Sequence, residues 1–361
     1  MKIFLFVSLI LAILLGSCSP AIVPATPIST AVRVPTQTAV PTVTPYPTPT
    51  RASTWTPEAT LTPPLNAYSQ YSIESLRKRE YGGGQVEVTQ KIYQNKVYTR
   101  YIIRYPSDGL TIYGYADIPR GEGRYPVIIM LHGKSDPGGY SILAQDTGYS
   151  EMFASDGYIV LHPNLRDYQP SDHGDNRFMV GMAVDVLNLI ALVKSGTGQD
   201  GIFKRANPER LGLWAFSMGG AVALKVLTVS SDVKAAFLYS PMSGDDYLNA
   251  GFLAKTGDAD AQLVLTLPPL VFMGISPQNF YKYITAAVDI HHGMVDSVIP
   301  PGWSQNTCTQ LKTLGKIINC YFYEGMNHVF DGNGGVKLKL RMSNFFATHL
   351  KAQPATATPT P

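Results

Sequence analysis

The feature that most limits how this chain can fold is a series of six short apolar runs. Uninterrupted apolar runs of this length are typical of strands buried on both faces of a parallel sheet. Stretches with helical patterning separate them, above all residues 177–196 and 303–316. The alternation predicts an α/β fold with a doubly wound, mostly parallel sheet. The runs are PVIIMLHG from Pro126, YIVLHP from Tyr158, RLGLWAF from Arg210, AAFLYSP from Ala235, AAVDIHHG from Ala286 and INCYFYEG from Ile318.

Two further segments, residues 98–105 and 110–119, flank the turn sequence Pro-Ser-Asp-Gly and predict an antiparallel pair at the start of the sheet. Right-handed crossovers place the carboxyl ends of parallel strands along one edge, where ligands bind. The residues that follow each apolar run are therefore the ones to inspect for function.

The amino-terminal residues 1–18 have the layout of a secretory signal peptide, with Lys2, an apolar run and small residues before Cys18. The apolar run is shorter than the roughly 20 residues that span a membrane. The sequence Leu-Gly-Ser-Cys resembles the lipobox of bacterial lipoproteins, in which the cysteine carries the lipid. We therefore expect an extracytoplasmic protein that is anchored in the membrane through Cys18. The alternative is a plain signal peptide with a chance cysteine.

Two segments rich in Pro, Thr and Ala flank the part of the chain that can fold, residues 19–65 and 352–361. Such composition cannot bury a core, so we expect an extended linker and a disordered tail. Residues 66–351 remain for one α/β domain. The formal net charge is only +3 and no basic run stands out, so we expect no nucleic-acid partner.

Apart from Cys18 the chain contains two cysteines, Cys308 in a predicted helix and Cys320 in the following strand. In an exported protein two such residues can pair as a disulfide. Two buried free thiols are the competing interpretation.

The motif after the run at Arg210 carries the strongest functional signal. Ser217 stands between a predicted strand and a predicted helix, and Ala215, Gly219 and Gly220 keep its surroundings small. A serine at such a corner needs small neighbours because strand and helix approach it closely, as in a nucleophile elbow. A serine that only caps the helix would explain the same residue without any chemistry.

Two partners follow in the order that this fold requires. Asp296 lies in the loop after the run at Ala286, and His328 lies in the loop after the run at Ile318. An imidazole can take the serine proton and return it to the leaving group, and a carboxylate fixes the imidazole tautomer. The sequence therefore predicts Ser217 as nucleophile, His328 as base and Asp296 as acid.

Five other polar residues compete with this assignment. Asp289, His291 and His292 lie in or at the end of an apolar strand, where a role in the core or at the sheet edge is favoured. His162 ends another strand and His173 lies in a polar loop, and either could line a pocket.

An oxyanion hole is also needed, because the tetrahedral intermediate carries negative charge on the former carbonyl oxygen. We expect the backbone N–H groups of Met218 and Lys134 to supply it. Residues 242–284 are long enough for a small lid of two or three helices over the site. Its apolar side chains either form an acyl pocket or pack against the sheet: Leu265, Leu267, Leu270, Val271, Phe272 and Met273.

Five segments in register resemble the catalytic domain of the prolyl oligopeptidase family and the dienelactone-hydrolase-like members of the α/β-hydrolase superfamily. The resemblance implies the same three residues, Ser217, Asp296 and His328. Ala215 departs from the glycine of many members. Family members with a propeller carry several hundred residues before the catalytic domain, and only residues 65–119 are available here, so we expect no propeller gate. The segments are PVIIMLHG, FASDGYIVLHPNLRD, NPERLGLWAFSMGG, HHGMVDSVIP and EGMNHVF.

These observations predict a serine hydrolase that cleaves a small-molecule ester or a short peptide through an acyl-enzyme, without a metal or organic cofactor. A carboxylesterase and a peptidase of prolyl oligopeptidase type remain open. A surface-binding protein that keeps the fold without turnover is the third possibility.

Overall fold

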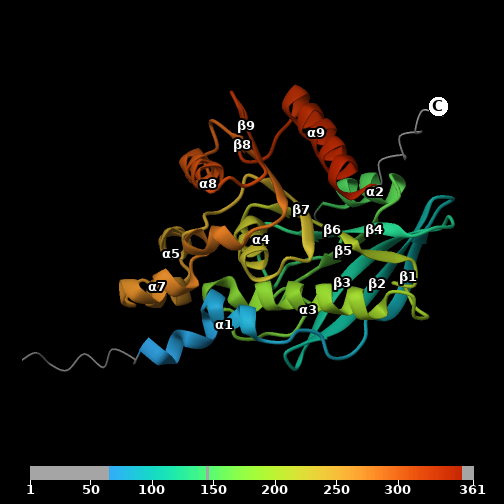
Figure 1. The fold of residues 1–361 in the computed structure, drawn as a ribbon, viewed down its shortest axis with the longest axis horizontal. Helices are drawn as coiled ribbons and strands as arrows, with labels where there is room; N and C mark the ends of the chain where they lie inside the picture. Colours follow the sequence, from blue (N-terminus) through green and yellow to red (C-terminus); the bar gives the residue numbers. More distant parts are fainter. Residues whose placement is uncertain (1–64, 144–145, 352–361) are drawn as a thin grey trace, which may run out of the picture. The chain divides into compact units, whose positions relative to one another are not determined.

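The computed structural model describes residues 65–143 and 146–351, all of which fall within one compact unit. The predictions for residues 1–18, for Cys18, for the linker up to residue 64 and for the tail from residue 352 concern parts of the chain outside these residues. Figure 1 shows a twisted central sheet with helices packed on both of its faces.

The sheet has nine strands among the described residues, in the order β1-β2-β3-β5-β4-β6-β7-β8-β9. The first three strands and the pairing of β3 with β5 are antiparallel, and every other pairing is parallel. The predicted doubly wound, mostly parallel sheet is thus confirmed. The strands are β1 Glu87–Gln94, β2 Tyr98–Ser107, β3 Leu110–Pro119, β4 Tyr125–Leu131, β5 Ile159–Pro163, β6 Ala206–Phe216, β7 Val233–Tyr239, β8 Ala287–Gly293 and β9 Ile318–Tyr323.

The helices divide between the two faces of the sheet. One face is covered by α1, α3, α4 and α8, and the other by α2 and α9, while α5, α6, α7 and η3 form the insertion between β7 and β8. The helices are η1 Leu65–Tyr71, α1 Ile73–Lys78, α2 Thr147–Ser155, η2 Arg177–Met179, α3 Val180–Gly196, α4 Met218–Val229, α5 Asp246–Lys255, α6 Ala259–Val264, α7 Pro269–Ile275, η3 Pro277–Tyr283, α8 Pro301–Thr313 and α9 Gly332–Leu350.

Two hydrophobic cores sandwich the sheet because successive strand residues point to opposite faces. In β4, Val127 and Ile129 pack into the core under α3 and α4, whereas Ile128 and Met130 pack into the core under α9. Both sets are fully buried, which explains why this strand has no polar alternation in the sequence.

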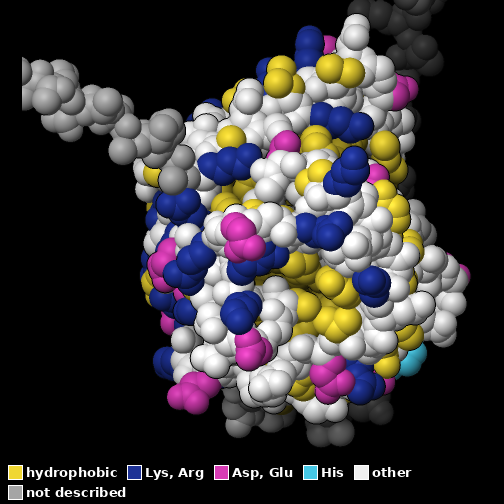
Figure 2. All heavy atoms as spheres, turned by 90° about the vertical axis from the view of Figure 1, so that its right-hand side faces the viewer, with side chains coloured by type: hydrophobic (Ala, Val, Ile, Leu, Met, Phe, Trp, Pro, Cys, Tyr) yellow, Lys and Arg dark blue, Asp and Glu magenta, His cyan; other side chains and the backbone are white. Residues whose placement is uncertain are grey.

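The helix over residues 177–196 is long and apolar enough, by length and composition, to cross a membrane. Within this domain it is a core helix, since 83% of its apolar window is buried. On the face shown in Figure 2, Lys and Arg side chains are interspersed with acidic and apolar ones.

Candidate active site

Ser217 lies at the corner between β6 and α4. Its backbone has φ 53° and ψ −115°, a conformation that is costly for a residue with a side chain. Hydrogen bonds hold the corner: the Ser217 N–H donates to the Tyr239 carbonyl over 3.0 Å, and the Ser217 carbonyl accepts from Gly220 and Met242 over 2.9 Å each. These hydrogen bonds hold Ser217 in its strained backbone conformation.

Two glycines make this corner possible. A Cβ on Gly219 would lie 2.3 Å from the Leu131 carbonyl oxygen, and one on Gly220 would lie 2.3 Å from the Pro241 Cβ. Neither contact can be relieved by a flexible side chain, so the two positions require glycine. Small neighbours at this corner are thus a steric necessity of the fold.

The Ser217 side chain makes no hydrogen bond that caps α4, although the residue stands at the N-cap position. Its Oγ instead lies 3.0 Å from His328 Nε2, and His328 Nδ1 lies 2.8 Å from Asp296 Oδ2. The capping interpretation of this serine therefore does not account for the structure. The chain Ser–His–Asp has the connectivity that moves a proton from a hydroxyl to an imidazole.

Asp296 is held as a carboxylate. Burial by itself would raise its pKa, but hydrogen bonds from His292, from His328 and from the Ile299 amide hold the pKa well below its usual range. The amides of Val298 and Ile299 donate to Oδ1 over 2.8 and 2.9 Å. A carboxylate with this many donors stays ionised and can stabilise an imidazolium.

His292 is a functional contact that sequence reasoning missed. It is fully buried at the end of β8, and its Nε2 lies 3.0 Å from Asp296 Oδ2. Its Nδ1 lies 2.7 Å from the Ser304 hydroxyl on α8, which fixes the ring. The only signal in the sequence was that His292 precedes Asp296 by four residues. This spacing does not show whether the His292 ring points toward the carboxylate.

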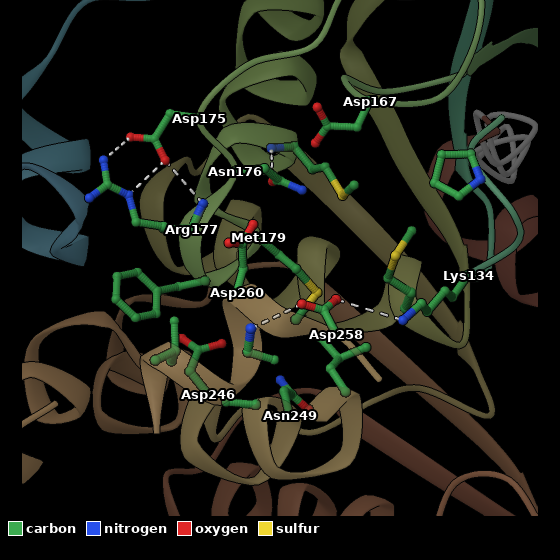
Figure 3. Close-up of a pocket in the computed structure, with 18 of the residues that line it drawn as sticks. Lys134, Asp167, Asp175, Asn176, Arg177, Met179, Asp246, Asn249, Asp258 and Asp260 are labelled. Carbon is green, nitrogen blue, oxygen red and sulfur yellow. Dashed lines mark hydrogen bonds and ion pairs between the residues drawn. The ribbon is translucent and has the colours of Figure 1, made fainter. Parts of the chain in front are cut away.

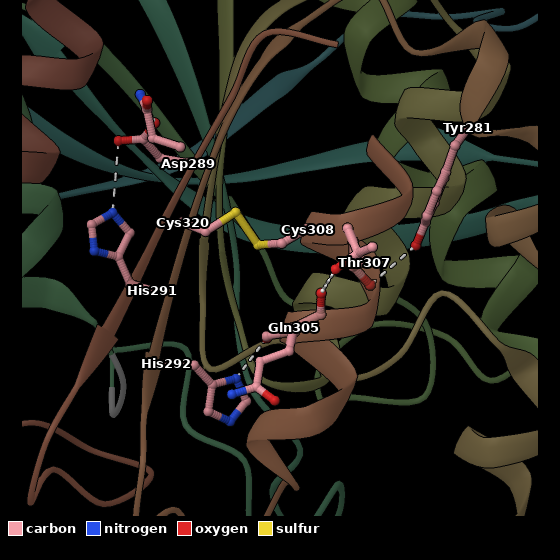
Figure 4. Close-up of a disulfide and its surroundings, with 11 residues drawn as sticks. Tyr281, Asp289, His291, His292, Gln305, Thr307, Cys308 and Cys320 are labelled. Carbon is pink, nitrogen blue, oxygen red and sulfur yellow. Dashed lines mark hydrogen bonds and ion pairs between the residues drawn. A yellow bond between two sulfur atoms is a disulfide. The ribbon is translucent and has the colours of Figure 1, made fainter. Parts of the chain in front are cut away.

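Asn327 ties the two catalytic loops together. Its Oδ1 accepts from the Ser297 amide over 2.9 Å and from the His328 amide over 2.7 Å. A disulfide between Cys308 of α8 and Cys320 of β9 joins the same two parts of the chain nearby (Figure 4). The loops that carry Asp296 and His328 are thus fixed relative to each other.

The two amides expected to bind an oxyanion lie around the same corner. The Gly219 N–H donates to the His132 carbonyl over 3.1 Å, and a Cβ on Gly133 would lie 3.3 Å from the Ser217 Cβ. The loop that carries Lys134 is therefore fastened to the start of α4. Among the described residues, the N–H groups of Met218 and Lys134 donate to no protein acceptor.

The competing residues occupy other places. His291 packs on Phe237 and contacts the Tyr323 hydroxyl, and Asp289 accepts from Asn319. His162 is fully buried beside Asp146, whereas His173 is exposed. In the described part of the chain, no group of three or more His, Cys, Asp or Glu side chains is arranged to hold a metal ion.

A cavity of about 560 Å³ adjoins the corner and opens under the insertion (Figure 3). Met218 and Lys134 line it, while neither Asp296 nor His328 does. Of the two interpretations of the six apolar side chains, an acyl pocket or packing in the core, the structure favours packing, because none of the six lines this cavity. Val271 and Phe272 pack in the core, and Leu270 and Met273 are exposed.

The family model that matches this chain is that of the dienelactone hydrolase family, over residues 112–336. The matched residues include the whole Ser–His–Asp chain. The protein belongs to the dienelactone hydrolase family. No curated protein sequence matches this family member.

Solved structures agree with the fold. Acetyl xylan esterase 1 from Thermoanaerobacterium sp. JW/SL YS485 is 17% identical, with a TM-score of 0.58 over 80% of this chain and 94% of that one. The acetyl xylan esterase from Paenibacillus sp. R4 is also 17% identical, with a TM-score of 0.56 over 80% of this chain and 100% of that one.

Peptidases share the fold as well. An acylaminoacyl peptidase from Pyrococcus horikoshii is 18% identical, with a TM-score of 0.57 over 78% of this chain and 52% of that one. This dienelactone hydrolase family member thus spans about half the length of that peptidase. The α/β-hydrolase fold and the family make it a serine hydrolase that acts on ester or peptide bonds.

Proposed function

We propose that this hydrolase is a carboxylesterase that works through an acyl-enzyme on Ser217. The observation that carries the proposal is the unbroken contact chain from Ser217 Oγ through His328 to Asp296, next to two backbone N–H groups that donate to no acceptor within residues 65–143 and 146–351. A nucleophile, a base, an orienting carboxylate and a free oxyanion site are the complete set for acyl transfer.

In the first step Ser217 Oγ attacks the ester carbonyl carbon while its proton moves to His328 Nε2. The carbonyl oxygen, on which negative charge develops, accepts hydrogen bonds from the amides of Met218 and Lys134. Each of these bonds stabilises the transition state by about 3 kcal/mol. The bond to the leaving alcohol then breaks, and His328 returns the proton to that oxygen. A water molecule then attacks the acyl carbon while its proton moves to His328. The bond to Ser217 Oγ breaks, His328 returns the proton to that oxygen, and the carboxylic acid is released.

The comparison of lengths favours an ester over a peptide as substrate. The two acetyl xylan esterases match over 94% and 100% of their length, whereas the peptidase matches over 52%. An ester also has the better leaving group, so it needs less assistance from substrate contacts outside the catalytic residues.

The test is kcat/KM of the full chain on p-nitrophenyl acetate and on a proline-containing peptide anilide, with Ser217→Ala as control. Turnover of the ester that disappears in Ser217→Ala supports the proposal. Turnover of the anilide at a comparable rate would make the protein a peptidase instead. Ester turnover that persists in Ser217→Ala would show that another residue is the nucleophile.

We further propose that Cys18 anchors the enzyme in a membrane on the extracytoplasmic side. The support is the placement of Cys18 directly after the apolar amino-terminal run, followed by a long Pro- and Thr-rich segment. Fractionation of cells that express the wild type and Cys18→Ala tests it. The variant should leave the membrane fraction, and its retention there would contradict the anchor.

A further inference from the structure

The cavity beside Ser217 has an unusual excess of carboxylates for a site that is expected to hold an acyl chain. Figure 3 shows them around one space, on the insertion and on the facing loop before α3. The basic residues that line the same cavity are Lys134 and Arg177. The carboxylates belong to Asp167, Asp175, Asp246, Asp258 and Asp260.

Both basic residues are already engaged. Arg177 pairs with Asp175, with guanidinium nitrogens 2.7 and 3.0 Å from the carboxylate oxygens. Lys134 Nζ lies 3.8 Å from Asp258 Oδ2. Asp260 has no hydrogen bond or ion pair with any described residue. The cavity therefore keeps negative charge that the protein does not neutralise.

Asp246 supplies an independent observation. It is 3% exposed at the start of α5, and its Oδ2 contacts the ammonium group of Lys225, which is fully buried. Its Oδ1 has no hydrogen-bond partner among the described residues, although the side chain lines the cavity. A buried carboxylate oxygen without a partner costs about 1–3 kcal/mol, so positive charge from a ligand in the cavity would be stabilising beside it.

The remaining walls suit a cationic group too. Aromatic rings of Phe178 and Tyr168 and the thioethers of Met179, Met182 and Met218 line the cavity. Aromatic faces attract ammonium groups, and thioethers are soft and adaptable. Carboxylates attract the same ammonium groups by charge, so the two kinds of wall favour the same ligand.

The position of the cavity selects the part of the substrate that enters it. Met218 and Lys134, whose amides are proposed to bind the oxyanion, line the cavity, whereas His328, which must meet the leaving oxygen, does not. The acyl group is therefore the part that extends into the cavity.

We infer that this hydrolase prefers esters whose acyl group carries a positively charged amine, held in the cavity by Asp246, Asp258 and Asp260. The inference rests on the proposed function, since it assigns the acyl specificity of the same site. The expected preference is about tenfold over a neutral acyl group of the same shape, because these are partly exposed ion pairs reinforced by cation–π contacts.

The test uses two p-nitrophenyl esters of equal shape, one of 4-(trimethylammonio)butanoic acid and one of 5,5-dimethylhexanoic acid. The measured quantity is the ratio of their kcat/KM values on the full-length protein. The ratio should be about ten at low ionic strength and should fall as salt is added. A ratio of one or less, or one that does not respond to salt, overturns the inference.

Two variants make the test specific. Asp258→Asn keeps a good helix N-cap at the start of α6, and Asp260→Asn changes an exposed residue, so both should fold. In the double variant the ratio should fall toward one. Asp200→Asn removes one negative charge from an exposed residue in the loop before β6 and should leave the ratio at the wild-type value. An unchanged ratio in the double variant contradicts the assignment.

Failure of the inference can be told apart from failure of the proposed function. If the neutral ester is hydrolysed and Ser217→Ala abolishes that activity, the esterase proposal stands whatever the ratio is. If neither ester is hydrolysed, the proposed function itself is contradicted, and with it the inference that rests on it.

Discussion

The nucleophile corner and the cavity next to it are built on opposite principles. At the corner, Ser217, Asp296 and His328 are connected to one another and to the surrounding backbone by short hydrogen bonds. Across the cavity, Asp246 Oδ1 and Asp260 lack partners in the described part of the chain. The comparison teaches that the protein fixes the reacting groups in advance and leaves polar groups open where the substrate must be recognised.

The largest expected effect comes from removing the nucleophile. Ser217→Ala should lower kcat/KM for p-nitrophenyl acetate by at least about 10⁴-fold, because the remaining residues of such a site cannot form the acyl-enzyme. Its melting temperature should stay at or above the wild-type value, since the side chain makes no helix-capping bond. A large loss of stability would mean that this serine has a structural role after all.

Loss of the disulfide should affect stability rather than chemistry. Cys308→Ala combined with Cys320→Ala opens a bridge over a sequence separation of 12 and should lower the free energy of unfolding by about 3 kcal/mol. Denaturant unfolding measures it, with and without a reductant. The reductant should destabilise the wild type and leave the double variant unchanged. Equal effects on both proteins would contradict a bridged wild type.

The contact between His292 and Asp296 should affect the rate more than binding. His292→Leu removes one of the two imidazoles that contact Asp296 Oδ2. We expect kcat to fall about 10- to 100-fold with little change in KM. His292→Gln, which can still donate, should restore part of the rate. The matched control is His291→Leu, which alters a neighbouring buried imidazole that contacts Tyr323 instead. Equal losses of kcat in both leucine variants would show a merely structural effect.

A smaller effect is expected from the titration of Asp296. In the unfolded chain an aspartate titrates near about pH 3.9, while the donors around Asp296 hold its folded pKa lower. The stability that the ionised group contributes is therefore complete above about pH 4 and is lost as the pH falls further. The difference in free energy of unfolding between wild type and Asp296→Asn should be constant from about pH 7 to 5 and should shrink below about pH 4. A difference that stays constant through the acid range would contradict the lowered pKa.

Much of the fold could be predicted from the sequence because β4, β5, β7, β8 and the second half of β6 are buried on both faces and therefore appear as uninterrupted apolar runs. The strand β1 was missed, since seven of its eight residues are exposed and carry no apolar pattern. Ser217, Asp296 and His328 could be predicted to lie close together, because each follows a parallel strand and the carboxyl ends of parallel strands meet at one edge of the sheet.

The cavity could not be predicted in the same way. Which side chains of residues 242–284 line it depends on how three short helices pack over the sheet, and short helices carry weak periodicity. The apolar residues of this segment attracted attention in the sequence, yet the lining comes from Asp246, Asp258 and Asp260 among others. The role of His292 was hidden because its approach to Asp296 depends on the exact turn after β8.

The most direct test of the central claim is to trap the acyl-enzyme. The full-length protein is mixed with p-nitrophenyl acetate, quenched in acid within the first turnover and digested for mass spectrometry. If Ser217 forms the acyl-enzyme, p-nitrophenol should appear in a burst of about one equivalent, with a single acetyl group on the peptide that contains Ser217. Release of p-nitrophenol without acylation of that peptide, or with acylation of another residue, would contradict it.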